Sequence, residues 1–509
     1  MTNHGREHIQ SVLDRRHLLK SAAGVVSIGE IMREGGLAEQ PESNVILEGY
    51  TDLLSYQPGD KVGLCVSTSL PHFSVEITRV GAQRETVFRK DKIAGRLCEV
   101  PDHASTHGCN WPISTQITVA PEWRSGYYEL KLRGAMSGQT PVEQDACFVV
   151  RAGTPGKESS ILLQLATNTY NAYNNWGGSC LYQGGPLPMM GKRVSFQRPM
   201  ARGHLSSPKG ELSRWAPYAG WHHWEREFVR WMEGQGCPVE FAVNSDLEQR
   251  PELLQHYQLI LSVGHDEYWS AGMRDNLETY ISNGGNVAFF SGNVAYWQGR
   301  CEDHGQALVC YKYGYKNDPH FHLENRNQLA TLWSNRLVNR PENQLTGVSF
   351  NYGGYHRFGS VPRGGGGYTI HRPEHWVFER TDLQWGDLLG AEEKIVGYEC
   401  DGCEYRIEQG NPVPTGRDGT PASFVILAKA PAALWETDLE FTAESLFGKT
   451  DEESQNRVRR GAAVMGVYTR GGTVFTTGCT EWSHGLAHKN PLVEQITRNV
   501  LRKLSREDI

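Results

Sequence analysis

Short apolar runs alternate with amphipathic segments between about residue 160 and residue 295, and this alternation constrains the fold more than any other feature of the chain. Four runs have the length and apolar composition of buried strands, and two longer ones have the periodicity of helices. The strand-like runs are ILLQLAT, VEFAV, LILSV and NVAFFSG, and the helix-like ones are HWEREFVRWMEGQGC and SAGMRDNLETYISNGG. Strands and helices that alternate in this way form a parallel sheet. We therefore predict an α/β domain over residues 158–509.

Residues 44–152 have a different sequence pattern. Short β-branched and aromatic runs follow one another there at near-regular spacing, separated by clusters of Pro, Gly and Asp, and helical periodicity is absent. This pattern predicts an all-β domain of the antiparallel sandwich type over residues 44–152. The turn-forming segment TPGKESS, residues 154–160, marks the boundary with the α/β part.

Length, charge and cysteine content limit the classes of function. A chain of 509 residues exceeds what one core usually supports, so more than one domain is expected. A net charge of −7 gives no basic surface for nucleic acid, and no apolar run is long enough to span a membrane as a helix. The eleven Cys are odd in number and scattered, which argues against a disulfide framework and favours a reducing, cytoplasmic location.

Residues 1–43 allow two interpretations. Arg15 and Arg16 precede the apolar run LLKSAAGVVSIG, as in a twin-arginine export signal, which would place the protein in the periplasm or outside the cell. The run is short, however, and Glu30 and Arg33 follow it directly. The alternative is an N-terminal arm on a cytoplasmic protein.

Polar and aromatic residues gather directly after three of the predicted strands. NTYNAYNNWGGSCLY follows the first strand, GHDEYWS follows LILSV, and SGNVAYW follows NVAFF. In an open parallel sheet, ligands bind beyond the carboxyl ends of the strands, where loops from several strands converge. The simpler interpretation is that the aromatic rings pack as a lid and that Asp266 or Ser270 caps the next helix. The coincidence of three such loops favours a functional site.

The residue types in these loops narrow the chemistry. A GxSxG elbow, the lysine of a phosphate-binding loop and an HExxH zinc motif are all absent from them. The available donors are carboxylate and phenol oxygens, accompanied by one His and one Asn. Phenolate and carboxylate oxygens favour a hard ion such as ferric iron over zinc or copper, and a strongly charged ion offsets the cost of a deprotonated tyrosine.

Five segments, in this order along the chain, resemble the catalytic domain of the N,N-dimethylformamidase large (beta) subunit family. They are TYNAYNNWGGSCLY, WEREFVRWMEGQGCPVEF, YQLILSVGHDEYWS, NGGNVAFFSGN and VGYECDG, and the resemblance covers roughly residues 160–485. It implies a glutamine-amidotransferase-like, that is flavodoxin-like, parallel-sheet domain after the β-sandwich. It also implies one mononuclear non-haem ferric iron (Fe³⁺) and hydrolysis of an amide without redox change.

The resemblance also assigns roles to individual residues. Within TYNAY, Tyr170 competes with Tyr173 for the first ligand position, and we favour Tyr173. His265 or Glu399 would act as general base on water, and Asn293 would donate a hydrogen bond to the developing oxyanion. The implied iron ligands are Tyr173, Tyr182 and Glu267, and the implied catalytic residues are His265, Asn293 and Glu399.

The chain departs from the family in the segment QGGPLPMMGKRVSFQRPM, where a polar stretch is expected. Met189, Met190 and Phe196 predict a more apolar pocket wall. The expected substrate is therefore a small-molecule amide whose identity stays open. Whether the chain forms a homo-oligomer or binds a small partner subunit is equally open.

Two other functions are alternatives to the iron hydrolase. A non-enzymatic carbohydrate- or small-molecule-binding module would need no metal and would stack its ligand on exposed aromatic rings. An amidotransferase-like hydrolase would use Cys479, in GCTEWSH after the strand-like run TVFTT, as nucleophile. The rings available for stacking are Trp176, Tyr268, Trp269, Tyr296 and Trp297.

Overall fold

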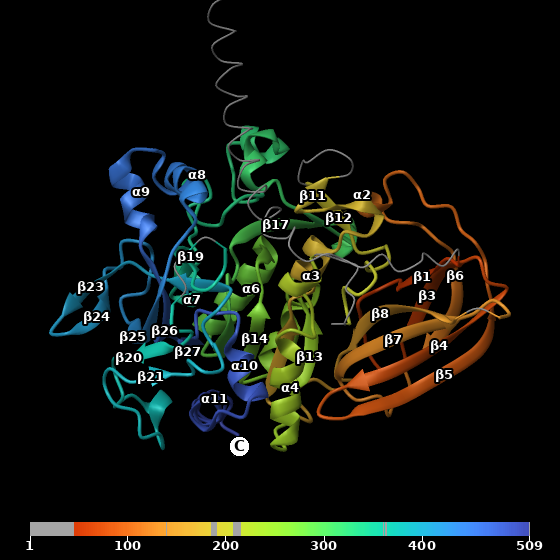
Figure 1. The fold of residues 1–509 in the computed structure, drawn as a ribbon, viewed down its shortest axis with the longest axis horizontal. Helices are drawn as coiled ribbons and strands as arrows, with labels where there is room; N and C mark the ends of the chain where they lie inside the picture. The colour runs from red at the N-terminus through yellow and green to blue at the C-terminus, as the bar shows by residue number, and fades with distance from the viewer. Residues whose placement is uncertain are drawn as a thin grey trace, which may run out of the picture.

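The computed structural model describes residues 45–138, 140–184, 191–206, 215–359, 361 and 364–507. The predicted combination of an all-β part and an α/β part is confirmed, and the two parts lie side by side in Figure 1. The N-terminal arm predicted for residues 1–43 lies outside the described residues, so both of its interpretations stay predictions. The domain limits at 44–152 and 158–509 also stay predictions.

The β-rich part consists of two sheets around one apolar core. Its neighbouring strands run antiparallel except for the parallel pair β2–β8. The core takes Leu64, Ile77 and Phe148 from alternate positions of the strands. The three-stranded sheet has the order β1 (Leu47–Thr51), β3 (Lys61–Thr68) and β6 (Ile113–Thr118), and the five-stranded sheet has the order β2 (Ser55–Tyr56), β8 (Val142–Val150), β7 (Gly126–Gly134), β4 (His72–Val80) and β5 (Arg84–Ala94).

A nine-stranded sheet forms the centre of the α/β part. Its first five strands are parallel and include all four that the sequence predicts: β13 (Glu240–Val243), β9 (Ile161–Leu165), β14 (Leu259–His265), β16 (Asn286–Gly292) and β27 (Gly472–Thr476). Numbered along the chain, these five have the order 2-1-3-4-5 that flavodoxin-like sheets share.

Four antiparallel strands extend this sheet: β26 (Gly461–Arg470), β25 (Val425–Ala432), β20 (Tyr368–Ile370) and β21 (Leu388–Leu389). Because the sheet is mixed in this way, the flavodoxin-like and glutamine-amidotransferase-like assignment stays a prediction.

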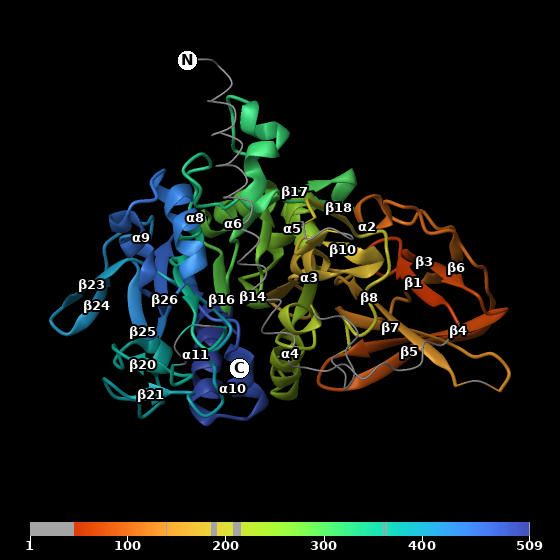
Figure 2. The same ribbon diagram turned by 45° about the horizontal axis from the view of Figure 1, so that its top comes forward.

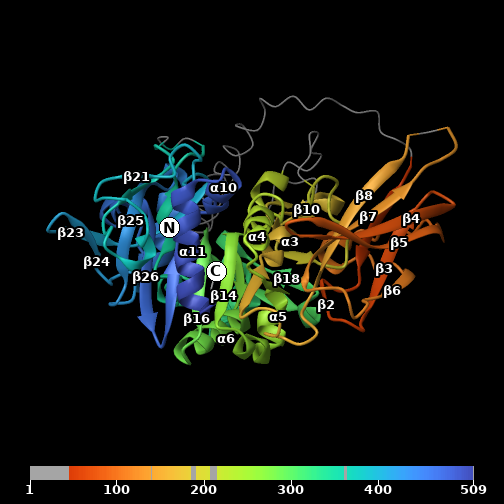
Figure 3. The ribbon, with the colours of Figure 1, turned by 90° about the horizontal axis from the view of Figure 1, so that it is seen from below.

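Helices cover both faces of the parallel strands. Leu163 and Phe290 face a core that includes Phe228 of α4, whereas Leu162 and Phe289 face a second core that includes Leu277 of α6. Figure 3 shows α4 and α10 on one side of β14 and β16, and α5 and α6 on the other. This is the arrangement that alternating strand residues produce when both sides of a sheet are buried. The helices are α2 (Ala104–His107), α3 (Thr167–Tyr173), α4 (Glu225–Gly234), α5 (Asn244–Gln249), α6 (Ala271–Ser282), α7 (Asn343–Thr346), α8 (Glu436–Phe447), α9 (Glu452–Arg459), α10 (Trp482–Ala487) and α11 (Pro491–Ser505).

Smaller elements gather at the carboxyl end of the parallel strands. Figure 2 shows α3, β10, β17 and β18 at this end of the molecule, beyond β14 and β16. The strands outside the three large sheets are β10 (Ser179–Cys180), β11 (Gln183–Gly184), β12 (Arg193–Ser195), β15 (Tyr268–Ser270), β17 (Trp297–Glu302), β18 (Ala307–Val309), β19 (Ser349–Tyr355), β22 (Glu399–Gly402), β23 (Tyr405–Glu408) and β24 (Asn411–Pro414). The short 3₁₀ helices are η2 (Trp176–Gly178), η3 (Ala216–Tyr218), η4 (Pro251–His256), η5 (Asp303–Gly305), η6 (Lys312–Asn317), η7 (Pro319–His322) and η8 (Trp376–Phe378).

Two further expectations concern cysteines and membrane spans. All eleven Cys lie in the described part of the chain, and each is free. This agrees with the expectation that the chain has no disulfide framework. Over the described ranges, no helix combines the length and the apolarity that a membrane crossing requires.

Glu342, next to α7, is a buried carboxyl that should make stability depend on pH. It is fully buried, and burial raises its pKa to about 8 although Arg274 opposes the shift. An acid with a raised pKa in the folded state contributes stability that is fully present below its unfolded pKa of 4.5 and is lost as pH rises through about 8. We expect Glu342→Gln to stabilise the protein relative to wild type at alkaline pH, by about 1.4 kcal/mol per pKa unit that is removed. Urea unfolding at mildly acidic and at alkaline pH measures this difference, and the exposed Glu324→Gln is the control.

Candidate active site

The three loops predicted to form a site meet at the carboxyl ends of β9, β14 and β16, which are neighbours in the sheet. Two glycines allow the backbone to pack closely there. Gly264 has a φ of +79°, and a Cβ at this position would lie 2.5 Å from the Trp224 side chain. A Cβ at Gly292 would lie 2.5 Å from the carbonyl oxygen of Glu399. Both positions therefore require glycine, and both lie beside candidate site residues.

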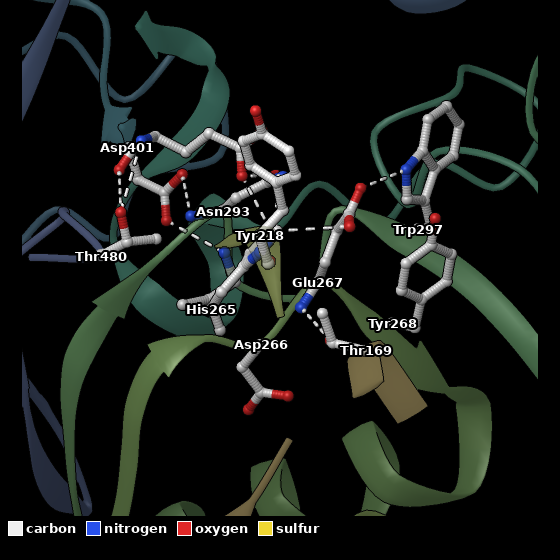
Figure 4. A network of polar contacts seen from close by, with 12 residues as sticks. Thr169, Tyr218, His265, Asp266, Glu267, Tyr268, Asn293, Trp297, Asp401 and Thr480 are labelled. Carbon is white, nitrogen blue, oxygen red and sulfur yellow. Dashed lines mark hydrogen bonds and ion pairs between the residues drawn. The ribbon is translucent and has the colours of Figure 1, made fainter. Parts of the chain in front are cut away.

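Glu267 lies at the centre of the site (Figure 4) and is 3% exposed. Tyr182 Oη lies 2.6 and 2.7 Å from the two carboxylate oxygens, and Trp297 Nε1 donates to Oε1 at 2.7 Å. Tyr268 Oη donates to Tyr182 Oη at 2.8 Å. The backbone N–H of Glu267 is fixed by Thr169 Oγ1, which accepts at 3.0 Å. Burial raises the pKa of Glu267, whereas His265 and Lys312 act to lower it.

His265 connects Glu267 with Glu399. Its Nε2 lies 2.8 Å from Glu399 Oε2 and 3.5 Å from Glu267 Oε2. Its Nδ1 donates to the carbonyl oxygen of Tyr218 at 2.7 Å, which fixes the orientation of the ring. Burial alone would lower the pKa of His265, but the two facing carboxylates outweigh it and raise the pKa to about 9. The imidazole is therefore cationic at neutral pH in this arrangement.

Asn293 lies beside this pair in a constrained backbone conformation. Its Nδ2 donates to Glu399 Oε2 at 3.0 Å and lies 3.4 Å from His265 Nε2. Its φ is +52°, in the left-handed region that Asn tolerates better than most residues. The Asp401 carboxylate accepts from the backbone N–H groups of Asn293 and Val294 at 2.9 and 3.1 Å and so holds this turn. Glu399 and Asp401 are two residues apart on β22, which places both on one face of the strand.

The structure distinguishes between Tyr170 and Tyr173. The Tyr173 ring lies 4.2 Å from the Tyr182 ring and 5.7 Å from the His265 ring, measured between centroids. A hydrogen bond with the Tyr173 side chain is among the influences that lower the pKa of Tyr182, against the larger effect of burial. Tyr170 instead donates to Glu225 Oε1 at 2.5 Å. Tyr173 is therefore the tyrosine of this pair that lies at the site.

Lys312 is a site residue that the sequence reasoning missed. It is 2% exposed, and its Nζ lies 3.2 Å from the centroid of the Tyr182 ring. Burial lowers its pKa to about 8, although Glu267 acts in the opposite direction. The residue begins the short 3₁₀ helix η6 after β18, and no periodicity or motif of the sequence associates it with Glu267. Asp401 was missed as well, although its spacing from Glu399 is a usable signal.

The aromatic residues after the strands do not form the exposed platform that a carbohydrate-binding module requires. Tyr268 and Trp269 are fully buried, and Tyr296 and Trp297 are 6% and 2% exposed. They pack into the apolar cores because the strand ends are covered by further elements. Only Trp176 is partly exposed among the five. The burial of these rings therefore contradicts the predicted aromatic surface for stacking on a carbohydrate. Ser270 caps α6 by accepting from the Met273 N–H at 3.2 Å, as the simpler interpretation of GHDEYWS predicts.

Cys479 is also unsuited to act as a nucleophile. It is fully buried, and burial raises its pKa, which disfavours the reactive thiolate. Its Sγ lies 3.2 Å from a carboxylate oxygen of Glu481 and 3.9 Å from Cys400 Sγ. Phe196 belongs to the buried apolar cluster that also contains Tyr173 and Trp215, whereas Met189 and Met190 lie outside the described residues.

The donor set fits a hard metal ion only if the phenols take part. No group of three or more His, Cys, Asp and Glu side chains is arranged to hold a metal in the part of the chain that the structure describes. The phenol oxygen of Tyr182, however, is within hydrogen-bond distance of both Glu267 oxygens, and Tyr173 adjoins it. Phenolate and carboxylate oxygens are suitable ligands for ferric iron.

A family model described as N,N-dimethylformamidase beta subunit-like, C-terminal, matches residues 74–495. The chain belongs to this family. The match includes every candidate site residue, and it begins within the β-rich part, at β4.

Two curated relatives are similar to this chain over 219 residues. They are the N,N-dimethylformamidase beta subunits of Paracoccus aminophilus, 24% identical, and of an Alcaligenes species, 23% identical. Each match covers 37% of this chain and 28% of the relative, so the matched part spans less than a third of the relatives' length. Among solved structures, one of murine CRIg covers 22% of this chain and 98% of its own at 13% identity, but its TM-score of 0.14 supports no comparison of folds.

Proposed function

We propose that this protein is a hydrolase that cleaves the C–N bond of a small amide at the site around Glu267. The observation that supports this most is the contact of Tyr182 with both oxygens of Glu267, next to the connected side chains of His265, Glu399 and Asn293. Membership of the family and the names of the two relatives support an amide as substrate. Because these relatives are named as beta subunits, we also propose that the chain binds further subunits.

Tyr182, Glu267 and Tyr173 would hold one ferric ion as a mononuclear non-haem centre. When bound, such an ion polarises a carbonyl group and makes coordinated water more acidic. Lys312 favours negative charge on the same side chains, because its ammonium group lies against the Tyr182 ring.

Glu399 and His265 act as the general base and the general acid of the reaction. Water adds to the amide carbon, the C–N bond breaks, and a carboxylic acid and an amine leave. Glu399 Oε2 accepts the proton of the attacking water, and His265 Nε2, 2.8 Å away, carries a proton to the amine nitrogen. Because the two groups are in direct contact, the proton that Glu399 has gained can pass to His265, which restores the starting protonation state of both after one turnover.

Asn293 orients Glu399 and can stabilise the tetrahedral intermediate. One hydrogen of Nδ2 is directed at Glu399, and the other faces His265 at the longer distance of 3.4 Å. Because the protonated Nε2 of His265 cannot accept this second hydrogen, the hydrogen is available to a developing oxyanion, and such a hydrogen bond contributes about 3 kcal/mol when well placed.

Iron analysis and visible spectroscopy of the purified protein test the proposal. We expect about one iron per chain, a tyrosinate-to-iron absorption band and hydrolysis of at least one small amide, with release of the amine as the readout. Tyr182→Phe should lose the band and most of the iron because it removes the phenol oxygen next to Glu267. The control is Tyr280→Phe, a buried tyrosine of α6 whose hydroxyl donates to the carbonyl of Tyr257. A colourless wild-type protein that cannot be reconstituted with iron would contradict the proposed metal centre.

A further inference from the structure

The connection between Tyr173 and Tyr182 has little regular structure of its own. It contains η2 and the two residues of β10, and Gly177 and Gly178 have φ values of +75° and +83°. Such a segment loses much conformational entropy when it is fixed. Both tyrosines nevertheless have to lie at one place for the proposed site to form.

Arg198 is bonded to this connection along its length. Its Nη1 donates to the carbonyl oxygens of Trp176 and Ser179 at 2.8 and 2.9 Å. Its Nη2 donates to the carbonyl of Asn174 at 2.8 Å and lies 3.3 Å from both oxygens of Asn171. Its Nε donates to the carbonyl of Ser195 at 3.0 Å. The guanidinium therefore bonds carbonyl groups from the end of α3, which Tyr173 closes, to the start of β10.

The charge of Arg198 makes this arrangement unusual. The side chain is 2% exposed, and its hydrogen bonds go to carbonyl oxygens instead of carboxylates. Burial lowers its pKa to about 10, so it stays cationic at neutral pH. A buried cation without a counter-ion is costly unless its donors are well bonded. The carbonyl end of α3 supplies partial negative charge, and the planar guanidinium offers five donors in a fixed plane where a lysine offers three from one nitrogen.

Residues next to Arg198 hold the same connection from the other side. Asn174 Nδ2 donates to the carbonyl of Pro199 at 3.0 Å, and Asn174 Oδ1 accepts from Ala201 N–H at 2.9 Å. The segment 195–201 thus clamps the residue that follows Tyr173.

We propose that Arg198 is a positioning residue that sets the separation of Tyr173 and Tyr182 by bonding the carbonyl groups of the connection between them. The inference rests on the proposed function for its effect on catalysis, but its effect on the connection is independent of it. Loss of the guanidinium would leave buried carbonyls without donors and release the two rings from their 4.2 Å contact.

The test compares Arg198→Met and Arg198→Lys with Arg193→Met. Arg193 is a matched control because it lies two residues before the segment 195–201, on β12, but pairs with Glu302 and Asp303, away from the tyrosines. We expect Arg198→Met to lower kcat by about 10²-fold, the effect of a misplacement of about 1 Å, with a smaller change in KM. Arg198→Lys keeps the charge but has only three donors, so its kcat should lie between those of the wild type and Arg198→Met.

Hydrogen–deuterium exchange followed by mass spectrometry gives a readout without activity. Peptides covering residues 171–182 should exchange faster in Arg198→Met than in wild type, less so in Arg198→Lys, and not in Arg193→Met, while peptides of α11 stay unchanged. Unaltered exchange of 171–182 in a folded Arg198→Met protein would overturn the proposal, as would unaltered exchange in Arg198→Lys if the Met variant does not fold. If the wild type hydrolyses no amide, the proposed function fails and the exchange experiment still decides the role of Arg198.

Discussion

Replacing Glu267 with Gln is expected to lower kcat/KM by at least about 10²-fold and to remove most of the bound iron. The carboxylate accepts from Tyr182 and Trp297 and faces the cation of His265. A Gln side chain removes the negative charge and replaces one acceptor by an NH₂ group. Because an NH₂ group donates but cannot accept, it cannot replace the carboxylate oxygen that contacts Tyr182 and faces His265.

Glu240→Gln is the matched control for this variant. Glu240 is 2% exposed and accepts from the N–H groups of Gly156 and Glu158 and from Tyr257 Oη, at the start of β13. Its replacement should cost stability but leave kcat and iron content per folded molecule unchanged. Iron content by elemental analysis and amine release are measured side by side for both variants. A Glu267→Gln protein with full iron content would exclude Glu267 as a ligand.

The sequence predicts those parts of the site that follow directly from parallel strands. His265 ends β14, Glu267 follows it closely, and Asn293 comes directly after β16. Neighbouring parallel strands end at one edge, so the proximity of these residues follows from the order of the apolar runs. Gly264 and Gly292, at the same strand ends, allow the close packing that brings these loops together.

Other parts of the site depend on contacts between distant segments that carry no periodic signal. Glu399 lies on β22, which pairs with β19 outside the central sheet, and the backbone of Cys400 forms an isolated antiparallel β-bridge with that of Cys479, beyond β27. Lys312 begins the short helix η6 and Arg198 lies in an irregular segment, and only tertiary packing shows that Lys312 contacts Tyr182 and that Arg198 bonds the connection between the tyrosines. The carbohydrate platform failed for a related physical reason. The sequence places aromatic rings after the strands, but it does not show that Tyr268, Trp269 and Trp297 lie on the short strands β15 and β17 and pack into buried apolar clusters.

The arrangement of charges explains why one imidazole connects the two halves of the site. Glu267 and Glu399 both approach His265 Nε2, so the cation offsets the repulsion between two buried carboxylates. Glu267 is bonded to Tyr182, whereas Glu399 is bonded to Asn293. This division predicts that proton transfer and iron binding can be separated by mutation.

Replacing His265 with Ala is therefore expected to lower kcat by about 10²- to 10⁴-fold and to leave most of the iron in place. The imidazole carries the proton between Glu399 and the departing amine, but the proposed ligands do not include it. Added imidazole should restore part of the turnover because the variant leaves a buried space between the two carboxylates. The control is His356→Ala, since His356 is equally buried but bonds the carbonyl of Pro431 and the N–H of Gly366. If His265→Ala keeps wild-type kcat, the proton must follow another route. If it loses iron as completely as Glu267→Gln does, the imidazole acts on the metal ligands, and the separation of the two functions fails.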